Sequence, residues 1–165
     1  MINNLLSFKT YFENLATEHV QINEFMYGDS GRIVSDRLTA LMKTSAGYPV
    51  LFLETPTIKF EYNNNSPKVV FDSAFVILSA IEQEWDAQDA EMNRLFNICV
   101  HILRRMCSDS KKNEFIFFPN APLEPLDNIM IDNALGWRVE FSLFNYIDIN
   151  SPDVCFVQSM WEEPA

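Results

Sequence analysis

The sequence predicts one α+β domain: a mostly antiparallel sheet packed against one long helix, with an additional N-terminal helix. Three observations indicate this class. Two stretches repeat apolar side chains at helical spacing, other stretches alternate polar and apolar residues, and the strand-like stretches follow one another as hairpins. The chain has 165 residues, 48% of them hydrophobic, which is enough for one core. We therefore expect a single domain over 1–165, with an extended C-terminal arm over 150–165.

The first stretch, at about residues 3–18, predicts an amphipathic helix. Leu5, Phe8, Phe12 and Leu15 recur every three or four residues, so a helix places them on one face. The stretch that follows is less regular. Residues 28–31 predict a turn and residues 33–42 a short helix.

Strand signals come next along the chain. A short apolar run at 48–53 is followed by Ile58, Phe60 and Tyr62, which alternate with polar residues. An asparagine-rich cluster then marks a turn, and apolar residues resume up to position 78. We expect a β-hairpin over 57–78.

The long helix is expected at 82–107. Its apolar residues, among them Leu95, Cys99 and Ile102, form one wide stripe. Acidic residues gather in its first part and basic residues in its last part, as the helix dipole favours. This helix has the apolar surface to cover one face of a sheet.

The last third returns to strand patterns. Residues 138–143 alternate strictly, which predicts a long strand over 136–149. Around it we expect a strand at 114–118, a proline-bounded loop at 121–125, an edge pairing at 127–132, and a short final strand at 153–157.

The charge balance argues against two kinds of partner. The chain has 23 acidic and 12 basic residues, a net charge of −11, and residues 115–165 contribute −7 because Arg138 is their only base. Phosphate binding needs a dense basic face, so no sequence-specific nucleic-acid binding is expected. No apolar run approaches the about 20 residues that span a bilayer, and the N-terminus lacks a basic signal region. We expect no membrane association, and the three cysteines to be reduced thiols.

One short motif suggests catalysis. Gly28-Asp29-Ser30-Gly31 coincides with the nucleophile motif of chymotrypsin-like serine proteases and is similar to the Gly-Asp-Ser block of lipase-like esterases. The first family needs a base and a buried acid upstream, where only His19 is available, and the second needs a late histidine, but none follows His101. A turn in which Gly28 and Gly31 adopt positive φ explains the motif better. We expect no enzyme, and keep a small hydrolase using Asp29 or Ser30 as the least favoured alternative.

A metal site is likewise not expected. Cys99, His101 and Cys107 lie close in sequence, but ligands on one helix face need a spacing of three or four residues. The first two point to different sides, so Cys99 is interpreted as a small core residue. No phosphate-binding loop is present either. We therefore expect no cofactor.

The long strand of the last third offers a candidate assembly surface. A sheet edge presents unpaired N–H and C=O groups, which a neighbouring subunit can complete. Aromatic residues of the kind enriched at interfaces lie near this strand, although Trp137 also suits the core. The candidate interface residues are Trp137, Arg138, Glu140, Tyr146, Asp148 and Trp161.

The order of elements resembles a known class of phage protein. The residues that carry the resemblance are Tyr-Pro-Val-Leu-Phe-Leu-Glu at 48–54, the helix at 82–107, and Asp-Asn-Ala-Leu-Gly-Trp-Arg-Val-Glu-Phe at 132–141. Together they resemble the tail-terminator and tail-completion proteins of the neck of long-tailed phages and of contractile injection systems.

The resemblance implies a structural virion protein without catalytic residues or cofactors. Such a protein forms a homo-oligomeric ring, for example a hexamer, that caps the tail tube and joins the head connector. Its partners are then the tail-tube and connector proteins, and its place is the tail or neck of the virion, after assembly in the host cytoplasm. The alternative is an acidic DNA mimic or inhibitor that binds a basic partner, since the acidic last third imitates phosphates.

Overall fold

The computed structural model describes residue 2 and residues 4–29, 48–63, 66–80, 85–112, 115–117, 122–129 and 134–146. The short helix predicted at 33–42, the final strand predicted at 153–157 and the arm at 150–165 lie outside these residues.

The described residues form two helices and a seven-stranded, mostly antiparallel sheet, which confirms the α+β class. One pair of strands, β1 and β2, is parallel. In chain order the elements are α1 (Leu5–Glu18), β1 (Glu24–Gly28), β2 (Val50–Glu54), β3 (Thr57–Asn63), β4 (Ser66–Ala80), α3 (Trp85–Lys111), β5 (Ile116–Phe117), β6 (Leu123–Ile129) and β7 (Ala134–Tyr146).

Two long strands form the centre of the sheet. β4 and β7 pair antiparallel along their length, from Lys68 opposite Tyr146 to Ala80 opposite Ala134. On the outer side of β4, β2 pairs with one half and β3 with the other half, and β1 lies beyond β2. On the outer side of β7, β6 and β5 pair with different parts of the strand. β7 is therefore an inner strand, and the expectation that it offers a long open edge is wrong.

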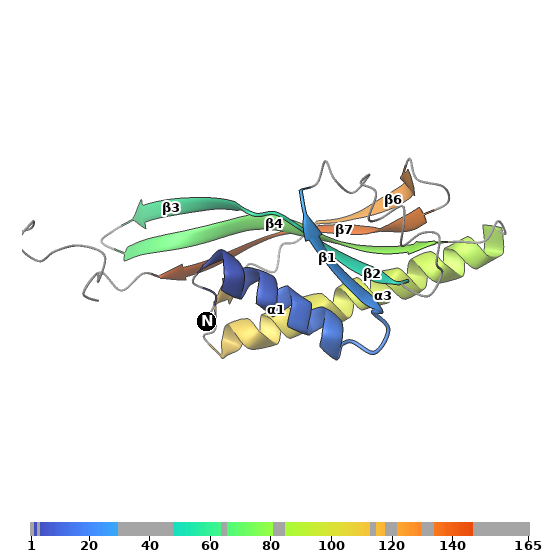
Figure 1. The fold of residues 1–165 in the computed structure, drawn as a ribbon, viewed down its shortest axis with the longest axis horizontal. Helices are drawn as coiled ribbons and strands as arrows, with labels where there is room; N and C mark the ends of the chain where they lie inside the picture. Colours follow the sequence, from blue (N-terminus) through green and yellow to red (C-terminus); the bar gives the residue numbers. More distant parts are fainter. Residues whose placement is uncertain are drawn as a thin grey trace, which may run out of the picture.

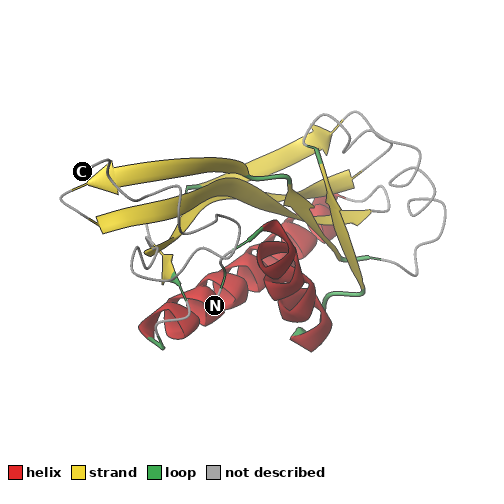
Figure 2. Ribbon diagram, turned by 60° about the vertical axis from the view of Figure 1, so that its left-hand side comes forward, coloured by secondary structure: helices red, strands yellow, loops and turns green. Residues whose placement is uncertain are grey.

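Both helices lie on the same side of the sheet (Figures 1 and 2). One buried cluster joins α1, α3 and this face of the sheet, because alternate residues of each strand point toward the helices. Aromatic rings are prominent in it: Phe8 stacks on Phe71, and Phe12 on Phe141. The opposite face of the sheet carries a smaller buried group around Phe52 and Val76.

Local chemistry explains most element boundaries. α1 begins at Leu5 because Asn4 and Ser7 form a capping box, in which the Ser7 N–H donates to Asn4 Oδ1 at 2.8 Å. The predicted hairpin at 57–78 is confirmed as β3 and β4. α3 ends at Lys111 instead of residue 107, since a buried carboxylate at Asp109 holds its last turn.

Two local predictions are wrong. Gly28 is the last residue of β1 and pairs with Glu54, and no described glycine has a positive φ, so the turn does not begin there. Residues 123–125 belong to β6 rather than to a loop. Pro125 is tolerated because β6 is an outer strand, where the missing N–H need not pair.

Asp109 connects the two helices. The Tyr11 hydroxyl of α1 donates to its Oδ2 at 3.1 Å, and Arg105 and Lys112 donate from 2.9 and 3.3 Å. Its side chain is only 3% exposed. Burial acts to raise the pKa of Asp109, but the hydrogen bonds from Arg105, Lys112 and Tyr11 outweigh it and hold the pKa below its usual value. The carboxylate is thus a charged clamp between α1 and α3.

We expect Asp109→Ala to lower the free energy of unfolding by about 2–3 kcal/mol at pH 7, because three donors lose a charged acceptor. A carboxyl group with a lowered native pKa stabilises the protein above its unfolded pKa of 3.8 and loses that effect as pH falls through the native value. Urea unfolding at pH 7 and near pH 3 would measure this. Glu18→Ala is the control, because the Glu18–Arg105 pair is exposed. An equal loss at both pH values would contradict the charged clamp.

The same two helices bring both histidines together. His19, at the end of α1, and His101, in α3, approach within 3.4 Å through Nε2 and Nδ1. Partial burial and the neighbouring His101 lower the pKa of His19. This contact lies between the helices and brings no histidine to the charged cleft described below.

Candidate functional site

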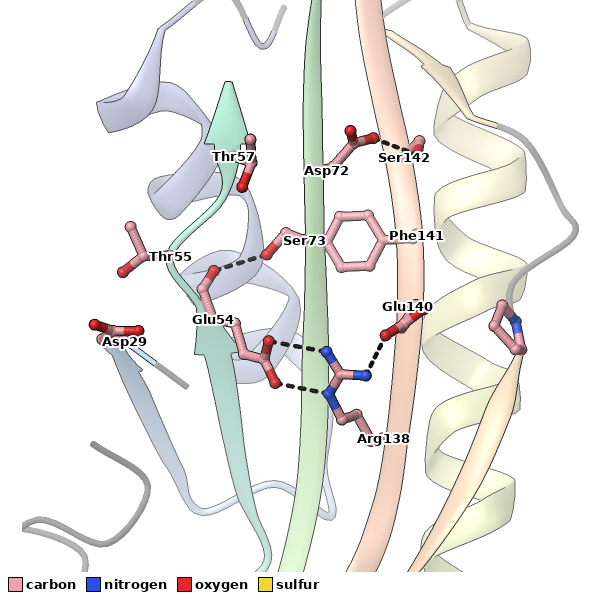
Figure 3. Close-up of a pocket in the computed structure, with 11 residues that line it drawn as sticks. Asp29, Glu54, Thr55, Thr57, Asp72, Ser73, Arg138, Glu140, Phe141 and Ser142 are labelled. Carbon is pink, nitrogen blue, oxygen red and sulfur yellow. Dashed lines mark hydrogen bonds and ion pairs between the residues drawn. The ribbon is translucent and has the colours of Figure 1, made fainter. Parts of the chain in front are cut away.

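A polar cleft of about 610 Å³ opens on the sheet face away from the helices (Figure 3). Strands β2, β4 and β7 supply most of its walls, and the start of β3 and residues after β1 and β2 and before β6 complete it. Its lining is rich in carboxylates and hydroxyls: Asp29, Glu54, Thr55, Thr57, Asp72, Ser73, Pro122, Arg138, Glu140, Phe141 and Ser142.

Arg138 lies in this cleft between Glu54 and Glu140, and both carboxylates bind its guanidinium (Figure 3). Its Nε and Nη2 donate to the two oxygens of Glu54 at 2.8 and 3.0 Å, a bidentate pair. Its Nη1 donates to Glu140, and Glu124 lies 3.9 Å from the same nitrogen. Glu54 first, and then Glu140, raise the pKa of Arg138 despite its partial burial. The guanidinium is therefore occupied within the chain.

The ion pair between Glu54 and Arg138 spans the central strand β4. Glu54 ends β2 on one side of β4, and Arg138 lies in β7 on the other. On β4, Val76 lies opposite Arg138 and Ala74 lies opposite Glu140, and both of these apolar residues are fully buried. Glu54 itself is only 7% exposed, so the guanidinium of Arg138 replaces water as the partner of this buried carboxylate.

The hydroxyl groups of the cleft also have partners. The Ser142 Oγ donates to Asp72 at 2.6 Å, and the Ser73 Oγ donates to the Glu54 carbonyl at 2.7 Å. Lys59 pairs with Asp72 at 2.6 Å. Burial acts to raise the pKa of Asp72, but the hydrogen bonds from Lys59 and Ser142 hold it below its usual value. The lining residues include no histidine, so they offer neither serine a neutral base.

The structure separates the sequence-predicted interface residues. Arg138 and Glu140 meet in the cleft, whereas Trp137 points the other way: its indole N–H donates to the Met92 carbonyl of α3 at 3.0 Å. Tyr146 is 60% exposed at the end of β7. The remaining two candidates, Asp148 and Trp161, lie outside the described residues.

The acidic last third is not a row of free carboxylates where it is described. Glu124 and Glu140 both lie beside Arg138, which offsets part of their charge. The other acidic candidate of this region, Asp148, lies outside the described residues. The described part therefore gives little support to a phosphate-like surface.

A second candidate site is the outer edge of β3. Within the described residues β3 pairs with β4 alone, and its far end extends with β4 and β7 beyond both helices (Figure 1). Ile58, Phe60 and Tyr62 point to the helix side, because Ile58 lies opposite the core residue Phe71. The helices do not cover this end, so the three side chains are 48%, 66% and 62% exposed.

Sequence reasoning found the alternation of Ile58, Phe60 and Tyr62 but not its exposure. The periodicity identified their common face, and only the length of the helices relative to the sheet shows that this face is uncovered. Likewise, nothing in the sequence of residues 50–54 marked Glu54 as the partner of Arg138, 84 residues later.

Other described residues show little that points to a metal or a reactive thiol. Cys99 is fully buried, and burial raises the pKa of its thiol to about 12, which suits a core residue. The described ranges contain no group of three or more metal-binding side chains. Neither described helix is long and apolar enough to cross a bilayer.

No protein-family model matches the chain, and no curated protein matches it.

Proposed function

We propose that this protein is a structural assembly subunit, not an enzyme, and that a neighbouring chain completes its sheet at β3. The open edge of β3 carries the proposal. Among the described residues no strand other than β4 pairs with β3, and the strand carries three large, exposed apolar side chains on one face. Monomers usually protect such edges, whereas assemblies use them to add strands from a neighbour.

The resemblance to tail-terminator and neck proteins gives the proposal its specific form. In that form the protein is a homo-oligomeric virion component that closes the tail tube and meets the head connector. The state of the charged cleft supports a non-catalytic role, because its arginine and both serine hydroxyls are bound to groups of the same chain.

Two observations on particles test this form. Mass spectrometry of purified phage or injection-system particles from the source is expected to detect the protein. Deletion of its gene is expected to produce tails of uncontrolled length, or tails that fail to join heads. Normal particles assembled without the protein would exclude the proposed function.

Self-association tests the β3 edge directly. We expect Phe60→Lys to lower the average mass in light scattering, because it replaces an exposed apolar contact with a charge at the centre of the edge. The fold is expected to remain intact, since an exposed substitution usually changes stability by less than about 0.5 kcal/mol. Leu6→Lys is the matched control: Leu6 is 73% exposed but lies on α1. Equal masses for both variants would place the contact elsewhere.

A further inference from the structure

We infer that the strand completing β3 is the β3 strand of a second copy of this chain, paired antiparallel about a two-fold axis at Phe60. The inference rests on one part of the proposed function, that a neighbouring chain completes the sheet at β3, and it names that chain without depending on the resemblance to tail-terminator proteins. It differs from a head-to-tail ring, in which β3 would meet a different edge of its neighbour.

The sheet geometry restricts the register of such a pair. Residues opposite each other in an antiparallel pair point to the same face of the sheet. In a pair related by a two-fold axis, one residue must therefore lie opposite its own copy, and the axis passes between these two copies. Phe60 is the middle residue of the seven in Thr57–Asn63. An axis there pairs the whole strand, with Ile58 opposite Tyr62 and Lys59 opposite Glu61 of the second copy.

Charge selects this register over its neighbours. An axis at Lys59 would place two lysines opposite each other, and an axis at Glu61 two glutamates, both of which are unfavourable. The axis at Phe60 instead creates two Lys59–Glu61 pairs. The strand is therefore charge-complementary to itself in one register.

The pairs inside each chain extend this pattern. Lys59 is bound to Asp72 of β4 at 2.6 Å, and Glu61 to Lys68 of β4 at 2.9 Å. Across the junction the charges then alternate in sign over four strands: Asp72, Lys59, then Glu61 and Lys68 of the second copy. In the dimer each β3 charge gains an opposite charge on the side of β3 that faces away from β4.

The apolar face agrees with the same register. Phe60 would meet Phe60 of the second copy, and each Ile58 would meet a Tyr62, which covers the three large exposed apolar side chains of the strand. Aromatic and aromatic–β-branched pairs are among the cross-strand contacts that stabilise sheets. A seven-residue edge is smaller than the interface of a permanent dimer, so we expect a concentration-dependent equilibrium.

Reversing single charges tests the register. Lys59→Glu and Glu61→Lys each place like charges opposite each other in the homodimer, and we expect dimerisation at least about 10-fold weaker for each. A mixture of the two variants restores both opposite-charge pairs in the heterodimer. Sedimentation equilibrium of the full chain should therefore show twice the 19.1 kDa chain mass for wild type and for the mixture, but mainly monomer for each variant alone.

Lys111→Glu is the control for the change in net charge, because Lys111 is an exposed residue at the end of α3. Circular dichroism checks that each variant folds. A wild-type protein that is monomeric at every concentration would overturn the two-fold pairing, with Lys59 and Glu61 then serving to protect the edge. Dimers unaffected by either charge reversal would also overturn it. Neither result would decide the structural role, because the experiments on purified particles and on the gene deletion test that role independently.

Discussion

Replacement of Gly136 by alanine is expected to destabilise the protein by about 3 kcal/mol or more. Gly136 lies in β7 opposite Leu78 of β4, where the two central strands approach closely. A Cβ atom there would lie 2.2 Å from the Ile77 carbonyl oxygen and 2.9 Å from a Leu78 methyl group. Because the first of these contacts is with backbone, the main pairing of the sheet would have to shift.

Urea unfolding followed by circular dichroism would measure this effect, and Gly28→Ala provides the control. Gly28 is also a strand glycine, but an added Cβ would meet only the Phe52 ring, at 3.8 Å. We expect that variant to change stability by less than about 1 kcal/mol. Similar stabilities for the two variants would show that β4 and β7 do not approach as closely as described.

Arg138→Ala is expected to cost about 3 kcal/mol, because it leaves the carboxylate of Glu54 buried without its bidentate partner. The Glu54 side chain is 10% exposed, so water replaces the guanidinium only in part. Arg138→Lys should recover some of this loss, since an ammonium group keeps the charge but not the two parallel hydrogen bonds.

Glu140→Ala serves as the control within the same network. Glu140 is 52% exposed, and its removal leaves the bond between Arg138 and Glu54 in place, so we expect a loss below about 1 kcal/mol. The double variant Glu54→Ala, Arg138→Ala should lose less stability than the sum of the two single variants. Each single variant leaves one charge without its partner, whereas the double variant removes both charges. Additive losses would mean that the pair across β4 contributes little.

Much of the fold follows from local patterns. The three-to-four-residue spacing of Phe8, Phe12 and Leu15 predicts α1, and all three are buried in the structure. The alternation at Ile58, Phe60 and Tyr62 predicts β3, and the hairpin with β4 forms in that register. The prediction of a loop from the prolines at 121–125 was wrong. Residues 123–125 form a strand because they pair with β7, a contact that composition does not reveal.

The candidate sites were less predictable than the elements. Arg138 stands out in the sequence as the one base of the acidic last third, but the sequence suggested it only as an interface residue. Its main partner, Glu54, comes from a strand 84 residues earlier and carries no local signal. Trp137, the adjacent residue, points to α3 instead, because neighbouring residues of a strand face opposite sides of the sheet.

Local periodicity was enough to establish the α+β class, the two long amphipathic elements and the faces of the strands, since each depends on residues only a few positions apart. Which strand forms an edge depends on pairing between distant segments. That pairing places β7 inside the sheet and β3 at its edge. The end of β3 lies beyond both helices, so Phe60 stays exposed. The candidate assembly surface therefore arises from the long-range order of the strands, although the residues that make it suitable for assembly are adjacent in the chain.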